Sequence, residues 1–272
     1  MCDLCIINSV KNRMISRRNF FSSAAALGAA AAVGASQTTP AMAEGHASVQ
    51  DMTYELSEEF PTYFGTPGIS SEAMFNFAEH GFNVSRLTLN EHTGTHIDAP
   101  LHFSADGAAV NEIPVSQLIA PLCVVDIATR AAENADTSVT PDDIKAWIAA
   151  HGPIPDGACV AMHSGWGTHV ATDKYRGADD NGVQHYPGFH VEATQMLLEE
   201  TKAASLASDT LSIDIGASTT FDTHYAWLPA GRFCIENIAN LDLVPPAGAT
   251  LVIGAPAHRG GSGGPARIFA ML

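Results

Sequence analysis

Four side chains that can bind a metal ion fall within eleven residues of this sequence. They are His92, His96, Asp98 and His102, in a chain of 272 residues that contains twelve histidines. The pattern His-x-x-x-His-x-Asp offers two imidazole nitrogens and a carboxylate, donors that zinc and manganese both accept. Because the pattern holds no thiolate, it favours a catalytic metal site over a structural one.

The spacing of these residues requires a bend in the chain. Residues 86–90 alternate between polar and apolar side chains, as in a strand, and His92 continues the polar face. An unbroken strand would place His96 about 13 Å further on, too far for the two imidazoles to share one ion easily. We therefore predict that Gly94 bends the chain and returns His96 to His92. Any one histidine is more often a hydrogen-bonded structural residue, but four such groups at this spacing favour a metal site.

The elements around this segment indicate a mixed α/β class. Thr140, Pro141 and the two acids after them predict the start of a helix that continues over 144–150. Apolar residues at helical spacing predict a second helix over 191–207. Short β-branched runs predict strands over 84–89, 122–127, 158–163, 211–215, 250–254 and 267–270. The pattern alone leaves the order of these strands open.

Composition predicts one sizeable folded domain over residues 44–272. The chain is 46% hydrophobic and 15% charged, and its formal net charge of −16 argues against nucleic acid or anionic lipid as a partner. Three cysteines, Cys123, Cys159 and Cys234, lie in this part of the chain. An odd and sparse set is no disulfide framework, so we predict buried free thiols.

The first 43 residues have the pattern of an export signal. Arg17 and Arg18 precede an apolar, alanine-rich run over 24–35, and 41–43 read Ala-Met-Ala, a small-x-small cleavage site. This resembles a twin-arginine signal, with Met14 as an alternative start. We therefore expect a periplasmic protein without a stable membrane anchor, since the apolar run is too short and too weakly hydrophobic to span a bilayer. The alternative is an uncleaved, alanine-rich tail.

Residues His92 to Phe103 match the H-x-G-T-H-x-D-x-P-x-H-F signature of the cyclase family of metal-dependent hydrolases. A later stretch resembles the family's second metal-binding region, where a histidine is followed twelve residues on by a glutamate, as His224 is by Glu236. The run from Gly260 to Arg267 is similar to the family's C-terminal G-S-x-x-P-x-R. The resemblance covers nearly all of residues 50–272. It implies a swivelling β/β/α fold in a single domain, with a mixed sheet and flanking helices, assembled as a homodimer or homotetramer.

The resemblance also implies a ligand set. His92, His96 and Asp98 would bind one ion, and Asp98 could bridge to a second ion completed by His224 and Glu236. The ions would be Zn²⁺ or Mn²⁺, one or two per chain.

The resemblance gives His102 the role of catalytic proton donor and acceptor. The expected activity is hydrolysis of the C–N bond in a small cyclic or N-acyl amide, such as an isatin-like lactam. Tyr63 and Phe64 occupy positions where the family often has an aromatic residue against the substrate, and core packing is the alternative. Trp166 could line a pocket or be structural, and Asp214 could orient a metal ligand or be a buried, capped carboxylate.

Two other functions remain open at this point. An arylformamidase acting on N-formylkynurenine is one, although an export signal speaks against a cytoplasmic task. A non-catalytic periplasmic protein that binds a metal or solute is the other. Such a protein would not need a histidine beside a complete ligand set, so the presence of His102 favours catalysis.

Overall fold

The structure is a computed structural model and describes residues 48–272. The signal predicted over residues 1–43 lies outside the described residues. Two compact units are distinguished: residues 71–88 belong to one, and residues 48–70 with 89–272 form the other. All the predicted site residues belong to the second unit.

The second unit is built on a mixed sheet, which has nine strands among the described residues. Four central strands, β5, β7, β9 and β10, run parallel to their neighbours in this group, and the remaining pairs are antiparallel. The strands in sheet order are β1 (Val49–Asp51), β13 (Arg267–Met271), β11 (Thr250–Gly254), β5 (Ile119–Asp126), β7 (Cys159–His163), β9 (Ser205–Ser208), β10 (Phe233–Glu236), β4 (His96–Asp98) and β12 (Gly263–Pro265).

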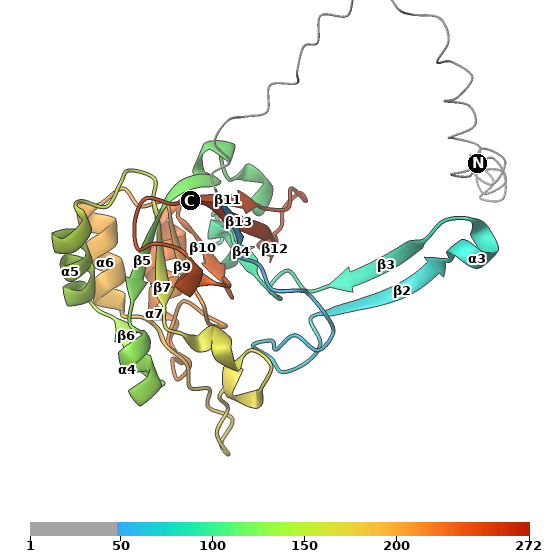
Figure 1. The fold of residues 1–272 in the computed structure, drawn as a ribbon, viewed down its shortest axis with the longest axis horizontal. Helices are drawn as coiled ribbons and strands as arrows, with labels where there is room; N and C mark the ends of the chain where they lie inside the picture. The colour runs from blue at the N-terminus through green and yellow to red at the C-terminus, as the bar shows by residue number, and fades with distance from the viewer. Residues whose placement is uncertain (1–47) are drawn as a thin grey trace, which may run out of the picture. The chain divides into compact units, whose positions relative to one another are not determined.

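Alternation along the strands produces a hydrophobic cluster on each face of the sheet. Leu122 and Val124 of β5 enter one cluster, whereas Cys123 and Val125 enter the other. The second cluster is covered by α5 (Pro141–His151) and α6 (Val191–Glu200), which lie side by side in Figure 1. The first cluster contains residues from β4, β5, β11 and β13, so the sheet curls around it.

Shorter elements connect these strands. Helices α4 (Ala128–Glu133) and α7 (Asp222–Trp227) are of one to two turns, and β6 (Ser138–Val139) pairs with β8 (Gly188–Phe189). The described 3₁₀ turns span Pro100–His102, Val110–Glu112, Val115–Gln117, Trp166–His169, Asp173–Tyr175, Leu228–Ala230 and Leu241–Leu243. None of the helices described is long and apolar enough to cross a bilayer.

The hairpin around residues 71–88 consists of β2 (Ile69–Phe75) and β3 (Val84–Leu89), joined by α3 (Phe77–His80). The Asn76 side chain caps α3 by accepting from the backbone N–H of Glu79, and Gly81 ends it in the left-handed conformation.

The predicted mixed α/β class is confirmed, and so are most of the predicted elements. Two predictions were wrong. The helix predicted to run to residue 207 ends at Glu200, because residues 205–208 are the fully buried strand β9 between β7 and β10. Residues 211–215 form no strand, although their alternation is real. The Ile213 side chain enters the core, and the Ile213 backbone N–H donates to the side chain of Glu236 instead of a neighbouring strand.

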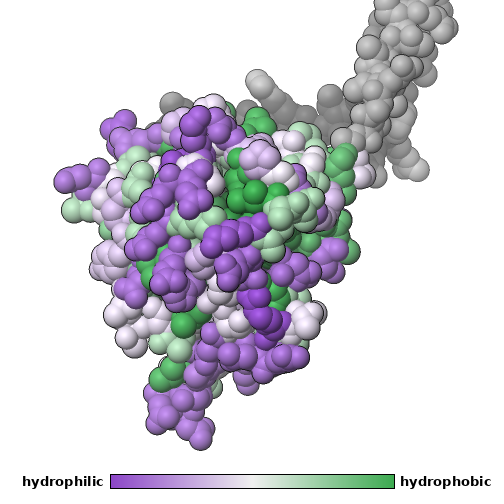
Figure 2. Space-filling view, turned by 90° about the vertical axis from the view of Figure 1, so that its left-hand side faces the viewer, coloured by the Kyte–Doolittle hydropathy of each residue, from purple (hydrophilic) through white to green (hydrophobic). Residues whose placement is uncertain are grey.

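The side of the molecule that carries α5 and α6 presents mostly hydrophilic side chains, with hydrophobic ones between them (Figure 2). The three cysteines of this part of the chain are buried and unpaired, as predicted.

Candidate active site

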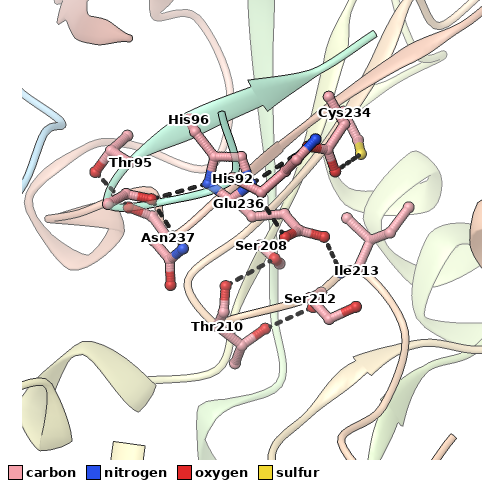
Figure 3. A network of polar contacts seen from close by, with 12 residues as sticks. His92, Thr95, His96, Ser208, Thr210, Ser212, Ile213, Cys234, Glu236 and Asn237 are labelled. Atoms are coloured by element: carbon pink, nitrogen blue, oxygen red, sulfur yellow. Dashed lines mark hydrogen bonds and ion pairs between the residues drawn. The ribbon is translucent and has the colours of Figure 1, made fainter. Parts of the chain in front are cut away.

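The pairing of two strands assembles the core of the site. β4 and β10 run antiparallel, with His96 opposite Glu236 and Asp98 opposite Cys234. Side chains two residues apart in a strand share a face, so all four project to the same side of the sheet. Figure 3 shows His96, Glu236 and Cys234 gathered there. His224 comes from α7 to the same place, and these five residues are all buried.

The bend predicted at Gly94 is present. Gly94 has a φ of +63°, a left-handed conformation that glycine adopts without a steric penalty. The bend places the ring centroids of His92 and His96 at 5.4 Å. A second glycine, Gly263, allows strand β12 to lie close against the His92 ring, because a Cβ at this position would lie 2.8 Å from Cε1 of His92.

The donor atoms meet at distances suited to a metal ion. The Nε2 atom of His96 lies 3.3 Å from Oδ1 of Asp98 and 3.4 Å from Oε2 of Glu236. Nε2 of His224 lies 3.2 Å from Oε1 of Glu236 and 3.6 Å from Oδ2 of Asp98. The Nδ1 atom of His92 lies 2.6 Å from Oδ1 of Asp98, which is a hydrogen-bond distance, so these two atoms would have to move apart to share an ion. The structure therefore brings together all five side chains that were predicted as ligands.

Hydrogen bonds fix which nitrogen two of these histidines present. Nδ1 of His96 lies 2.9 Å from the carbonyl oxygen of Gly94 and donates to it, so Nε2 faces the cluster. Nδ1 of His224 donates to Oδ2 of Asp214 at 2.6 Å, again leaving Nε2 for the cluster. Asp214 also accepts from the backbone N–H groups of Thr223 and His224, at the first turn of α7. This carboxylate thus orients a predicted ligand and caps its helix, which were the two alternatives for Asp214.

His92 is oriented by residues far away in the sequence. The hydroxyl of Ser262 donates to Oε2 of Glu91 at 2.5 Å, so its oxygen accepts from Nε2–H of His92 at 2.9 Å. Nε2 of His258 donates a hydrogen bond to Oε1 of Glu91 at 2.6 Å. Nδ1 of His92 is therefore the nitrogen left to bind an ion beside Asp98.

The residues present fit a divalent cation. Nε2 of His96 is buried without a hydrogen-bond partner, although two carboxylate oxygens lie close to it. Ligands about 2.0–2.1 Å from a tetrahedral ion are separated by about 3.3–3.4 Å, which matches these two distances. An ion at this point would satisfy Nε2 of His96 as well as the carboxylates.

The electrostatics of the cluster also call for positive charge. Burial opposes a charge on His96, but Asp98 and Glu236 raise the pKa of His96 to about 9. Burial opposes a charge on His224 as well, yet hydrogen bonds to Asp214, Asp98 and Glu236 raise the pKa of His224 well above its usual range. Buried carboxylates require a compensating cation. A divalent ion can take the place of these protons.

His102 lies beside the cluster and outside its close contacts. Its ring stacks on that of His92, with a centroid separation of 3.9 Å and an angle of 23°. Burial lowers the pKa of His102 to about 4, and the neighbouring His92 and His224 act in the same direction, against Asp98. The imidazole is therefore neutral at neutral pH and can accept a proton.

A cavity opens onto the cluster. His92, His96, His102, His224 and Glu236 line it on one side, and an aromatic group completes it, made of Tyr63, Phe64, Phe103 and Phe221. The predicted aromatic residues Tyr63 and Phe64 are thus at the cavity, with Phe64 72% exposed.

Trp166 is placed elsewhere. Its ring is buried among Phe60, Tyr175 and Tyr186, and its Nε1–H donates to the carbonyl of Tyr175. The structure does not bring Trp166 to the cavity, and its contacts are those of a core residue.

Sequence reasoning missed several residues of this site. Phe221 has a φ of +53°, unusual for a bulky side chain, and its ring lies 6.1 Å from that of Tyr63 and 5.7 Å from that of Phe103. Cys234 was predicted only as a buried thiol. The alternation Cys-Ile-Glu could have placed it on the face of Glu236, but only with β10 already recognised as a strand.

Comparison with known proteins agrees with this geometry. A family model described as putative cyclase matches residues 50–215. Isatin hydrolase of Roseibium aggregatum is 31% identical over 219 residues, which cover 76% of this chain and 82% of the relative.

Two solved structures are also similar. Isatin hydrolase A from Labrenzia aggregata, bound to benzyl benzoate, has a TM-score of 0.78 and 32% identity, covering 83% of this chain and 93% of its own. An isatin hydrolase bound to the product analogue thioisatinate has a TM-score of 0.79 and 27% identity. This match covers 95% of the present chain and 99% of that chain.

Fold, donor cluster and relatives together define a metal-dependent amidohydrolase, an enzyme acting on a C–N bond other than a peptide bond. The chain belongs to the cyclase family and is homologous to isatin hydrolase.

Proposed function

We propose that this enzyme opens a small cyclic amide of the isatin type. The observation that carries the proposal is the combination of a buried donor cluster with a neutral His102, both facing one aromatic-lined cavity. The names of the relatives point to the same substrate class. Tyr63, Phe103 and Phe221 offer flat apolar surfaces for a planar ring.

Each side chain has a defined task in this proposal. His92, His96 and Asp98 would hold one divalent ion, and Asp98, His224 and Glu236 would hold a second. Bound there, such an ion supplies Lewis acidity to the carbonyl and lowers the pKa of water. His102 takes a proton from the attacking water and returns it to the leaving nitrogen. A C–O bond forms, the C–N bond of the ring breaks, and the product carries a free amine and a carboxylate, whose proton passes to the solvent.

We propose Zn²⁺ or Mn²⁺ as the ion, one or two per chain. Imidazole and carboxylate donors suit both metals. From the sequence we further propose a periplasmic enzyme, exported by a twin-arginine signal, that assembles as a homodimer or homotetramer.

The test is metal analysis of the purified full chain, followed by assays on isatin and N-formylkynurenine with and without a chelator. We expect stoichiometric metal and ring opening of isatin that stops with chelator and returns with Zn²⁺ or Mn²⁺. Turnover of N-formylkynurenine alone would assign the enzyme as an arylformamidase. Bound metal without turnover of either compound would contradict the proposed substrate and direct the search to other amides and esters.

A further inference from the structure

Cys234 points into the donor cluster. It lies directly opposite Asp98 across the β4–β10 pair and shares a face with Glu236, two residues on. Its Sγ atom lies 3.3 Å from Oδ2 of Asp98, the contact drawn from the sulfur in Figure 3.

Three further donor atoms lie near the carboxylate of Asp98. One atom from each of Asp98, His224, Cys234 and Glu236 lies within 4.8 Å of all the others, and all four residues are buried. The second group of this kind, His92, His96 and Asp98, shares only Asp98 with it. The described part of the chain therefore holds two adjacent groups of donors with different chemistry, and one of them includes sulfur.

We propose that Cys234 is a thiolate ligand of the second metal position, together with Asp98, His224 and Glu236. This inference rests on the proposed function, which places an ion there. On binding, the S–H bond is replaced by a sulfur–metal bond and one proton is released to the solvent. No redox change is involved.

The two positions then differ in the way that catalytic and structural zinc sites differ. A position with four protein ligands is closed, whereas three ligands leave a place for water or substrate. Ligands of both positions line the cavity, His92 and His96 for one and His224 and Glu236 for the other, so the number of protein ligands is what separates them. With three protein ligands the position at His92 is the open one, and with four the position at Cys234 holds its ion in place and fixes Asp98.

The thiolate also determines which metal is retained. Sulfur donors favour zinc and cobalt over manganese, which prefers oxygen donors. We expect the second position to bind Zn²⁺ in preference to Mn²⁺, while the position at His92 discriminates less.

Cobalt provides a readout that does not depend on activity. We would titrate the metal-free full chain with Co²⁺, with Cys2 and Cys5 replaced by serine in every sample so that neither contributes a thiolate. The expected result is two bound ions and a thiolate-to-cobalt charge-transfer band in the near ultraviolet.

The matched variants are Cys234→Ser and Cys159→Ser. Serine at 234 keeps a hydrogen-bond donor to Asp98 but removes the sulfur, so loss of the band distinguishes a ligand from a simple hydrogen bond. We expect this variant to lose the band and to bind one ion at least about tenfold more weakly in chelator competition. Cys159, buried elsewhere on β7, should be replaceable without effect on the band.

Three results would overturn the inference: two bound cobalt ions without the band, a band that survives Cys234→Ser, or a single bound ion. If Cys234→Ser does not fold, X-ray absorption of the zinc-loaded parent decides, since a sulfur scatterer is required at the metal. Isatin turnover without the band would contradict the thiolate ligand and leave the proposed function standing. The band without isatin turnover would support the thiolate ligand and contradict the proposed substrate.

Discussion

His102 and the five predicted ligands differ in their contacts. The ligands form close pairs with one another, whereas His102 makes a ring contact with His92. The change His102→Ala should therefore leave the bound metal in place and reduce kcat by about 10²–10⁴-fold, the usual contribution of a general acid–base group. Metal analysis and steady-state kinetics on the proposed amide test this, with the exposed His151→Ala as the control. Loss of metal in His102→Ala would make His102 a ligand.

The protonation of His102 can be measured directly. Burial lowers its pKa to about 4, below the ordinary value near 6.5, so the folded protein binds this proton less readily than the unfolded chain. Stability from the neutral form is present above about pH 6.5 and is lost as the pH falls through about 4. Titration of the metal-free protein by NMR, assigned with His102→Ala, should give a midpoint well below 6.5. A midpoint at or above 6.5 would contradict the neutral base.

Ser262 illustrates how a side chain outside the cluster can control a ligand. The change Ser262→Ala removes both the acceptor for Nε2–H of His92 and the bond to Glu91. We expect metal affinity to fall by about 10–100-fold, as is common when an outer partner of a ligand is lost. Chelator competition measures this, with the exposed Ser116→Ala as the control. Unchanged affinity in Ser262→Ala would show that His92 needs no such support.

At the scale of elements, α5 shows a cap that can be read from sequence. The Thr140 side chain accepts from the backbone N–H of Asp143, and Asp143 accepts from the backbone N–H of Thr140. The change Thr140→Ala should lower the free energy of unfolding by about 1 kcal/mol without changing metal content. Chemical denaturation tests this against Lys145→Ala, an exposed change on the same helix that removes only a surface ion pair. Equal effects of the two would exclude a special role for the cap.

The elements near the site depend on one another. α7 presents His224 because Asp214 accepts from the first turn of this helix, and Asp214 itself lies in a segment without regular structure. Glu236 links the same segment to β10 through the backbone of Ile213. The alternation of residues 211–215 predicted a strand. In the structure the backbone N–H of Ile213 donates to the Glu236 side chain, whereas the Ile213 carbonyl accepts from Phe189 of β8, so no regular strand pairing forms.

On the scale of the whole molecule, the metal site lies between segments far apart in sequence. An ion that binds only the folded state raises stability by about 2.7 kcal/mol at a concentration of 100 times its Kd. For a domain of this size, we expect removal of metal to lower Tm by about 5–10 °C, and readdition to restore it. Thermal unfolding with and without chelator measures this. An unchanged Tm would mean that the cluster does not hold an ion in the folded protein.

The sequence alone determined the local part of this enzyme. His92, His96 and Asp98 are recognisable because their spacing, together with the turn at Gly94, is set within seven residues. The capped helix and most strands follow from caps and alternation, which are also local. The resemblance to a family predicted His224 and Glu236 as further ligands, although no spacing in the sequence connects them to the first group.

Only the tertiary structure decided how these groups meet. The register of β10 on β4 brings Cys234 to Asp98, 136 residues away, and β12 brings Ser262 to His92, 170 residues away. The aromatic residues of the cavity likewise come from three separate segments. Such contacts depend on strand order and register, which short-range propensities do not encode, because many pairings of these strands would satisfy the same alternation.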